Sequence, residues 1–278
     1  MKRDGYDAID AVNWSTLKLM GRSPAHYHAH LQRRVDDEDT DSLVLGRVTH
    51  TAVFEPDRLD VDYCLWEGRR AGDEYEAFCV DAERKGQEVV LSKVMDRAMR
   101  IGLAVRSNEV CRNVIVRGEA EKTLRWSVEV PNWGNVACKG RLDFIGDNGI
   151  VDLKTTRDAS PKRFGISVAE YEYYAQAAFY RDAHLAVTGI DAGFWIIAVE
   201  SAAPHVSQLY RVPDWMLDLG RERYMSLLAR LMECRERDQW PGYATEELDV
   251  QLPPWATPEF PDENDGGLDD LVFTERSN

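Results

Sequence analysis

Residues 140–156 read GRLDFIGDNGIVDLKTT, and this stretch decides the fold class. Apolar residues on both sides of GDNG, a sequence typical of tight turns, predict two antiparallel strands joined as a β-hairpin. If the turn is a four-residue loop, or a two-residue loop centred on residues 147–148, Asp143 lies directly opposite Asp152. A two-residue turn at 148–149 would instead offset the two acids.

The two acids and a neighbouring lysine form a pattern with chemical consequences. Carboxylates that face each other across two strands repel, and a divalent cation such as Mg²⁺ removes that cost. Lys154 shares a strand face with Asp152, where its charge can orient or deprotonate a water, or stabilise charge developing on a phosphodiester. The alternative is a solvated hairpin whose charged side chains face water.

Composition limits the classes of function. The chain has 278 residues, of which 44% are hydrophobic and 30% are charged, so a sizeable core can form and wholesale disorder is excluded. Asp and Glu number 49 against 34 Lys and Arg, which gives a formal net charge of −15. This argues against a protein that coats nucleic acid through bulk positive charge, but a local basic groove stays open.

One strip of the sequence is locally basic. Residues 139–163 hold six basic and four acidic residues, a net charge of +2 that could guide a DNA strand. The expected DNA contacts in this strip are Arg141, Arg157, Lys162 and Arg163. Near the N-terminus, Ser15 and Arg22 either contact a terminal phosphate or belong to a solvated helix face.

Targeting and cysteine patterns exclude other classes. The N-terminus carries no secretory signal and no apolar run is long enough to span a membrane, so we expect a cytoplasmic protein. The five cysteines are dispersed and include no CxxC pair. We therefore expect neither a zinc ribbon nor an iron–sulfur cluster.

The periodicity of apolar residues divides the chain into three parts and a tail. Residues 1–110 are expected to be mostly helical, 115–212 to form a sheet and a helix, and 213–238 to form a long helix. We expect residues 1–252 to make one domain. Residues 253–278 are rich in Pro, Gly and Asp, carry a net charge of −6, and are expected to be a flexible tail.

Turn and capping residues set the expected element boundaries. Helices are expected to begin at Asn13 or Ser15, at Ser23 and at Ser92, and a further helix to run from Ser167, with Glu170 in a capping box, to about Val187. Strands are expected at 124–130, 136–145, 150–156, 192–200 and 206–212. The order of these elements predicts an α/β fold.

Asp143 followed by Asp152-Leu153-Lys154 is similar to the signature of PD-(D/E)xK nucleases. A wider set of motifs resembles the phage and prophage RecE-type exonuclease branch (exonuclease VIII), which is related to lambda exonuclease and RecB-type nuclease domains. The motifs are AVNWSTLKLMGRSPAHY (Ala11–Tyr27), LGRVTH (Leu45–His50), CKGRLDFI with DLKTT, and YYAQAAFY (Tyr173–Tyr180). The sequence departs from the pattern at Leu142, where the family has Pro, and at Asp152, where Glu is common.

The resemblance implies a restriction-endonuclease-like fold, with a central mixed sheet flanked by helices and a helical N-terminal region. It implies that Asp143 and Asp152 bind metal together with the backbone carbonyl of Leu153, and that Lys154 is the catalytic lysine. The expected cofactor is Mg²⁺ or Mn²⁺, with two ions in the site.

Four further residues acquire roles only through the resemblance. His50 matches a metal-binding histidine after an LGxxxH pattern, although a lone histidine is more often part of a core or surface. Glu121, expected just before the first strand, would support the metal shell; the alternative is a surface carboxylate. Gln176, expected to be catalytic, and Tyr180, expected to contact DNA, share one helix face. The alternative for both is ordinary helix packing.

The resemblance also implies an activity. The substrate would be the ends of linear double-stranded DNA, digested 5′ to 3′ in phage-type homologous recombination. Relatives form closed rings, so a homo-oligomer is expected, with a single-strand annealing protein as partner in the cytoplasm of a bacterial host. The rival functions are a structure- or site-dependent endonuclease and a non-catalytic module that binds DNA ends or acts as an adaptor.

Overall fold

A computed structural model describes residues 3–32, 40–244 and 246–253. The chain divides into two units, Met1–Tyr243 and Ala244–Asn278, and the helices and strands of the described residues all lie in the first. The tail expected at 253–278 lies outside the described residues except for Pro253.

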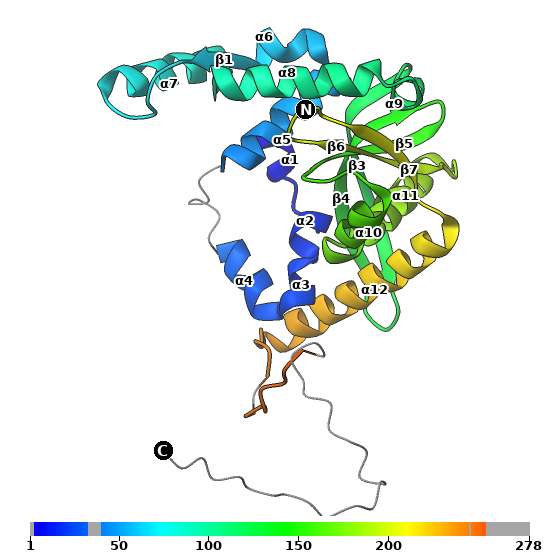
Figure 1. Cartoon of the computed structure of the whole chain (residues 1–278). Helices are drawn as coiled ribbons and strands as arrows, with labels where there is room; N and C mark the ends of the chain where they lie inside the picture. Colours follow the sequence, from blue (N-terminus) through cyan, green and yellow to red (C-terminus); the bar gives the residue numbers. More distant parts are fainter. Residues whose placement is uncertain (1–2, 33–39, 245, 254–278) are drawn as a thin grey trace, which may run out of the picture. The chain divides into compact units, whose positions relative to one another are not determined.

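A five-stranded mixed sheet forms the centre of the first unit (Figure 1). Its strands, in spatial order, are β3 (Gly118–Val130), β4 (Gly134–Gly146), β5 (Gly149–Thr156), β6 (Phe194–Glu200) and β7 (Ser207–Arg211). β5 and β6 are parallel and the other neighbours are antiparallel. The expected α/β fold with a mixed sheet is confirmed, and each expected strand is present with boundaries within a few residues, except that β3 begins six residues earlier.

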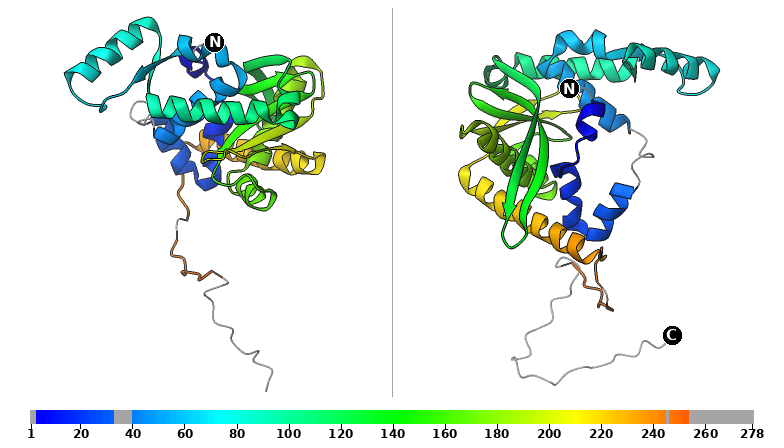
Figure 2. Two further views of the ribbon diagram at one scale, coloured as in Figure 1. Left: turned by 45° about the horizontal axis from the view of Figure 1, so that its top comes forward. Right: turned by 180° about the vertical axis from the view of Figure 1, so that it is seen from behind.

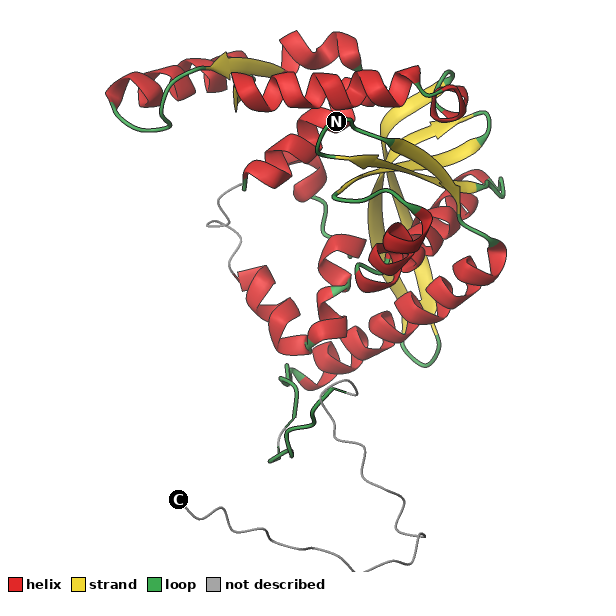
Figure 3. Ribbon diagram, viewed as in Figure 1, coloured by secondary structure: helices red, strands yellow, loops and turns green. Residues whose placement is uncertain are grey.

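Helices lie on two sides of this sheet (Figure 3). They are α1 Arg3–Asp7, α2 Trp14–Leu17, α3 Leu19–Arg22, α4 Pro24–Gln32, α5 Asp41–Phe54, α6 Leu59–Asp62, α7 Asp73–Lys85, α8 Ser92–Ser107, α9 Glu109–Val114, α10 Pro161–Glu170, α11 Tyr173–Thr188 and α12 Asp214–Arg237, with a 3₁₀ turn at Pro56–Arg58. One hydrophobic core joins the sheet to α10, α11 and α12, and a second joins it to α5 and α8.

Strand β5 separates these two cores. Ile150 belongs to the core with α11 and α12, whereas Val151 and Leu153 belong to the core with α5 and α8. This follows from the alternation of side chains along a strand. Both faces are covered, which explains the nearly continuous apolar sequence of β5 and of its parallel neighbour β6.

The N-terminal segment takes the place of β5 beside the outer half of β4. Pairing between β4 and β5 covers only Phe144–Gly146 and Gly149–Val151. Further along β4, the Val12 N–H donates to the Ala137 carbonyl at 2.9 Å, and the Lys139 N–H donates to the Val12 carbonyl at 2.8 Å. The edge of β4 is therefore satisfied by a segment more than 120 residues away in sequence.

Most expected helix boundaries hold. Asn13 caps α2 through a hydrogen bond from the Thr16 N–H, and Ser23 precedes α4, where its hydroxyl oxygen accepts from the His26 N–H at 3.3 Å. Ser92 does not cap α8, because Leu91 holds the cap position and Ser92 is the first helical residue. The hydroxyl oxygen of Ser92 is buried and makes no hydrogen bond within the described residues, so it does not cap the helix.

The single helix expected from Ser167 to Val187 is two helices, α10 and α11. Ser167 lies inside α10, and the break falls at Glu172, whose φ of 55° is left-handed. Arg223 of α12 pairs with the Glu172 carboxylate at 2.6 Å. Tertiary contact thus stabilises a break that local capping signals do not predict.

The N-terminal part also contains two strands that the sequence did not predict. β1 (Tyr63–Trp66) and β2 (Glu88–Leu91) pair in parallel, with α7 between them (Figure 2). Each strand has only four residues, too few for a clear alternation. Residues 1–110 are otherwise mostly helical, as expected.

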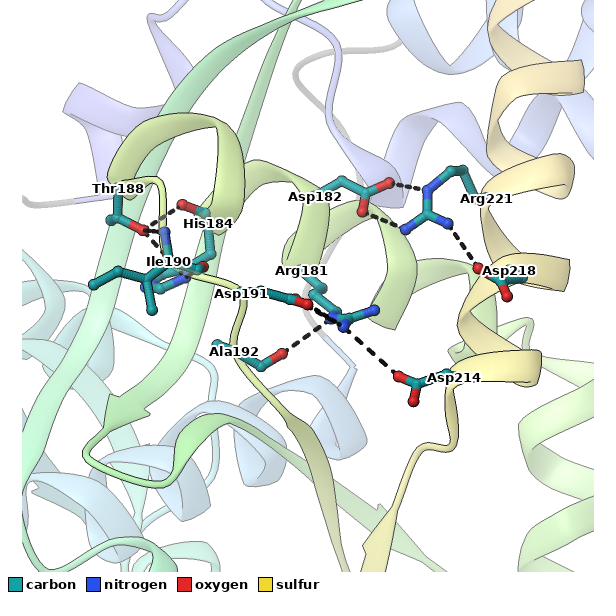
Figure 4. A network of polar contacts seen from close by, with 10 residues as sticks. All are labelled: Arg181, Asp182, His184, Thr188, Ile190, Asp191, Ala192, Asp214, Asp218 and Arg221. Atoms are coloured by element: carbon teal, nitrogen blue, oxygen red, sulfur yellow. Dashed lines mark hydrogen bonds and ion pairs between the residues drawn. The ribbon is translucent and has the colours of Figure 1, made fainter.

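A polar network fastens α11 to α12 (Figure 4). Arg221 donates from Nε and Nη2 to the two carboxylate oxygens of Asp182, both at 2.7 Å, and the Tyr224 hydroxyl donates to the same carboxylate at 2.6 Å. Arg181 pairs with Asp191 at 2.7 Å. Charged, bidentate bonds of this kind hold the helices in one orientation.

Within the described residues, no helix is long and apolar enough to cross a membrane.

Candidate active site

The site begins where β4 and β5 part. Gly146 pairs with Gly149 and Ile145 with Ile150, which is the register predicted for a two-residue turn centred on residues 147–148. The ladder ends at Phe144↔Val151, one residue before the two acids. The sequence predicted that Asp143 and Asp152 face each other as a cross-strand pair. In the structure they lie beyond the end of the ladder and do not form such a pair. Instead, the Asp143 carboxylate reaches across the gap and accepts a hydrogen bond from the Leu153 N–H at 2.8 Å.

This hydrogen bond also orients the carbonyl of Leu153. In an extended strand the N–H and C=O of one residue point to the same edge. Since the Leu153 N–H points at Asp143, its carbonyl faces the same gap between β4 and β5. The backbone oxygen named by the family resemblance is thus directed toward the acids.

Asp152 and Lys154 project from the other side of the gap as a buried pair. The Lys154 Nζ lies 2.7 Å from Asp152 Oδ2, with the side chains 17% and 3% exposed. Asp152 Oδ1 is buried and has no hydrogen-bond partner among the described residues. The ammonium group also lies over the ring of Tyr173, 4.8 Å from its centroid.

The electrostatics of this pair follow from burial. Burial raises the pKa of Asp152 to about 6; the charge of Lys154 opposes this rise and that of Asp143 adds to it. Burial by itself would lower the pKa of Lys154, but the carboxylates of Asp152 and Asp143 outweigh it and raise that pKa. Lys154 is therefore held in its charged form.

Two further donors gather around Asp143. Ligand atoms of His50, Glu121 and Asp143 all lie within 4.8 Å of one another, and His50 Nδ1 is 3.5 Å from Asp143 Oδ2. His50 comes from the middle of α5. A mixed set of imidazole and carboxylate donors is typical of a site for a divalent cation.

The sequence predicted that Glu121 lies just before the first strand of the sheet. In the structure Glu121 lies within that strand, β3. The register on either side, Ala120↔Phe144 and Lys122↔Leu142, places it opposite Asp143. Its φ of 53° is left-handed, a conformation that disfavours a side chain with a Cβ. The distortion occurs where Glu121 joins His50 and Asp143, so strain coincides with the candidate metal ligands.

Arg141, expected to contact DNA, turns into this cluster. Its Nε lies 2.7 Å from Glu121 Oε2, and its guanidinium lies over the ring of Tyr6, 5.3 Å from the centroid. Burial raises the pKa of Glu121, and the neighbouring Arg141 charge opposes that rise. Arg141 therefore neutralises part of the negative charge in the cluster.

Gln176 and Tyr180 lie one turn apart on α11, and their side chains are hydrogen-bonded to each other. The ring of Tyr180 packs against Gly140 of β4, where a Cβ would lie 2.9 Å from Cε1 of the tyrosine. Burial raises the pKa of Tyr180. The charges of Asp143 and Asp152 add to this rise, and the contact with Gly140 places this face of α11 against β4, three residues before Asp143.

The remaining candidates lie outside the cluster. Arg157 and Arg163 are exposed and line a cleft of about 990 Å³ beyond the end of β5, while Lys162 is exposed beside it in sequence. The Ser15 hydroxyl donates to Asn13 Oδ1 at 2.8 Å, and Arg22 Nε donates to the Tyr243 hydroxyl at 3.1 Å. Both residues are exposed, and Arg22 has a partner more than 200 residues away in the chain.

The structure adds residues that the sequence did not assign to the site. Tyr6 and Tyr173 pack against Arg141 and Lys154, and nothing in their local sequence signals this. Lys18, which the sequence offered with Ser15 and Arg22 as a contact to a terminal phosphate, has its pKa lowered by burial and by the charge of Lys154. These contacts depend on how distant elements meet.

No curated protein matches the chain. Among solved structures, the "Putative exonuclease" of Eubacterium rectale has a TM-score of 0.63 at 15% identity, over 91% of this chain and 96% of that one. At this identity the likeness shows a shared fold alone.

Two other structures are more distant. SSO0001 is 14% identical over 77% of this chain and 84% of that one, with a TM-score of 0.29. LHK-Exo, in complex with dAMP, is 14% identical over 72% of this chain and 97% of that one, with a TM-score of 0.27. Scores this low carry no argument.

A family described as a PDDEXK-like domain of unknown function (DUF3799) matches residues 13–250. The match spans the sheet, the flanking helices from α2 to α12, and the parting of β4 and β5 where Asp143, Asp152 and Lys154 meet. The match covers well over half of the chain. The chain belongs to this family of PDDEXK-like domains.

Proposed function

We propose that this protein is a divalent-metal-dependent exonuclease that hydrolyses the phosphodiester bonds of linear double-stranded DNA. One observation carries the proposal: Asp143, Asp152 and Lys154 converge where β4 and β5 part, with His50 and Glu121 beside them. Membership in a PDDEXK-like family supports a nuclease.

The residues of this site fit a divalent cation. Asp143, Asp152, Glu121 and His50 are the side chains that would hold it, together with the Leu153 carbonyl. Asp152 Oδ1 is buried with no hydrogen-bond partner among the described residues, and such an atom is costly unless something binds it. Oxygen donors suit Mg²⁺ and an added imidazole suits Mn²⁺, and we propose two ions.

The cation supplies positive charge that polarises the phosphoryl group and favours deprotonation of the attacking water. Contacts with Asp152 and with the ring of Tyr173 hold the ammonium group of Lys154 in place beside the acids. We assign it the role of orienting the attacking water and stabilising the charge that develops on the phosphate oxygens.

Neighbouring residues would position the DNA. The amide of Gln176 is one turn from Tyr180 on the helix face beside the acids, where it can donate to a phosphate oxygen. Tyr180 packs on Gly140 and keeps this face of α11 close to β4. We propose that Gln176 contacts the scissile phosphate and that Tyr180 helps to exclude water.

The finer features of the proposal rest on the resemblance of motifs. They are 5′-to-3′ polarity, a role in phage-type recombination, a homo-oligomeric ring and a single-strand annealing partner. Mass measurement in solution tests the ring. Binding to a co-encoded annealing protein would test the partner.

The decisive experiment compares two DNA substrates. End-labelled linear duplex and closed circular plasmid are incubated with the protein and Mg²⁺ or Mn²⁺. We expect metal-dependent loss of the linear DNA alone, and the label released first gives the polarity.

Asp152→Ala should abolish the activity. Asp147→Ala, at an exposed position in the turn of the same hairpin, is the matched control and should retain it. Cleavage of the circle would support an endonuclease instead. Hydrolysis of neither substrate with either metal would leave the non-catalytic binding module.

A further inference from the structure

The first residues of the chain lie against the strand that carries the site. Residues 3–12, here called the N-terminal strap, comprise α1 and the stretch that follows it to β4 (Figure 1). The strap ends in a parallel bridge between Val12 and Cys138. It therefore covers the part of β4 that comes just before Arg141 and Asp143, where β4 is no longer paired with β5.

Lys139 of β4 fastens the strap. Only 4% of this residue is exposed, and its Nζ donates to the carbonyl oxygens of Tyr6 at 2.9 Å, Asp7 at 3.3 Å and Ile9 at 2.8 Å. The first two carbonyls belong to the last turn of α1, where backbone oxygens have no partner within the helix. A buried ammonium is costly unless it is bound in this way, so Lys139 and the strap stabilise each other.

The strap brings the ring of Tyr6 onto two cations of β4. Lys139 and Arg141 are two residues apart on the strand, so their side chains share one face. The centroid of the Tyr6 ring lies 4.7 Å from Lys139 Nζ and 5.3 Å from the Arg141 guanidinium. Because the face of an aromatic ring attracts cations, Tyr6 holds the guanidinium in place although a second positive charge lies beside it.

Arg141 connects the strap to the metal cluster. Its Nε lies 2.7 Å from Glu121 Oε2, and Glu121 is one of the three residues whose ligand atoms gather with His50 and Asp143. The side chains of Arg141 and Glu121 are 31% and 38% exposed. An ion pair this exposed contributes little by itself, since a long side chain loses entropy when it is held in one geometry. The contact with Tyr6 supplies the second point of attachment.

We propose that the N-terminal strap positions the metal cluster: Lys139 locks the strap, and Tyr6 holds Arg141 against Glu121. The inference rests on the proposed nuclease function and adds Tyr6 and Lys139 as positioning residues. An Arg141 held in this place sets the positive charge that a cation meets at Glu121, so the strap tunes metal affinity. Tyr6 lies outside residues 13–250, the range of the family match.

Hydrogen exchange tests the strap without metal or DNA. NMR of the full chain in EDTA follows the Val12 amide, which donates to the Ala137 carbonyl, and the Nε–H of Arg141. We expect Tyr6→Ala to speed exchange at Arg141 about two- to fivefold, while Tyr6→Phe keeps the wild-type rate. Val12 should exchange normally in both, because Lys139 still holds the strap. Lys139→Met should speed both sites, and Val12 by more than about tenfold.

Two exposed substitutions are the matched controls. Trp215→Ala removes an aromatic side chain at the start of α12 that is 65% exposed, and Lys85→Met removes an exposed ammonium of α7. Both should keep the wild-type rates at Val12 and Arg141. Thermal unfolding checks that each variant is folded, and the Tyr6 variants decide the matter if Lys139→Met is not. A wild-type exchange rate at Arg141 in Tyr6→Ala would overturn the proposal.

Metal binding shows whether Tyr6 acts through Arg141. In calorimetric titrations of the metal-free protein, Tyr6→Ala should bind Mn²⁺ about two- to fivefold more tightly, because a released Arg141 competes less for Glu121. The same change in an Arg141→Gln background should have no effect. A purely structural role for Tyr6 would give equal effects in both backgrounds, and that result would contradict the proposal.

Hydrolysis of linear duplex separates failure of this inference from failure of the proposed function. If the wild type hydrolyses no DNA but Tyr6→Ala speeds exchange at Arg141 as expected, the nuclease proposal fails and the positioning role of the strap stands. If the wild type hydrolyses DNA and Tyr6→Ala matches it in exchange at Arg141 and in Mn²⁺ affinity, the strap proposal fails alone.

Discussion

The carboxyl group of Asp152 is buried, so its contribution to the free energy of unfolding decreases as pH rises. Burial raises its pKa to about 6 in the folded protein, above its ordinary value of 3.8. For a raised pKa, the stabilising contribution is full below the unfolded-state pKa and is lost as pH rises through about 6. In EDTA, the free energy of unfolding of the wild type relative to Asp152→Asn should fall by about 2 kcal/mol from pH 4 to 7.

A saturating divalent cation should reverse this loss. With Mn²⁺ at pH 7.5, we expect the Tm of the wild type to rise and that of Asp152→Asn to stay nearly constant, because the ion binds only the folded wild-type site. Chemical unfolding at several pH values and thermal scans with and without Mn²⁺ measure both effects. If the difference in free energy of unfolding between the wild type and Asp152→Asn does not change between pH 4 and 7, the argument from the burial of Asp152 is contradicted.

Arg141 makes a second prediction at this scale, because its ion pair with Glu121 competes with a cation for the same carboxylate. Arg141→Gln should raise the affinity for Mn²⁺ about three- to tenfold by removing a nearby positive charge. Calorimetric titration of the apoprotein measures it. Arg125→Gln, an exposed change on the neighbouring strand β3, is the control and should leave the affinity unchanged. Weaker Mn²⁺ binding in Arg141→Gln would show that Arg141 supports the site instead.

Among the elements, the break between α10 and α11 places Tyr173 under Lys154. Glu172 adopts a left-handed φ there and is held by Arg223 of α12 at 2.6 Å. Both side chains are partly exposed, so Arg223→Ala should lower the free energy of unfolding by only about 1 kcal/mol. It should lower kcat more than this loss suggests, because Tyr173 and Lys154 shift together.

Arg237→Ala is the matched control for this helix. It removes an exposed ion pair with Glu233, 2.8 Å long and within α12, and should change neither quantity appreciably. Urea unfolding and steady-state hydrolysis of linear duplex measure both variants. Equal kcat values for the two would show that the break has no role in positioning the site.

For the whole molecule, charge is distributed unevenly. Residues 253–278 contribute −6 of the net −15, so the rest of the chain carries −9. Removing them should strengthen DNA binding at low salt, because long-range repulsion falls, and the gain should vanish near 0.2 M salt as screening increases. The Tm should stay constant if residues 1–252 fold as one domain, as we propose. A Tm several degrees lower would show that the tail belongs to the fold.

Much of the sheet and part of the candidate site can be predicted from short stretches of the sequence. The register of the hairpin, the nearness of Asp152 to Lys154, and the positions of the five sheet strands along the chain depend on alternation and turn residues close together in the chain. These signals act over a few residues, where backbone geometry dictates which side chains share a face. They also carry the family resemblance.

Other features arise only when distant segments meet. Beyond the point where β4 and β5 part, Val12 pairs with the outer half of β4, and Glu172, with its left-handed φ, pairs with Arg223. Arg141 turns toward Glu121, and the ring of Tyr173 supports Lys154. No local pattern encodes these contacts, because their energies come from partners that chain folding brings together from elsewhere in the sequence.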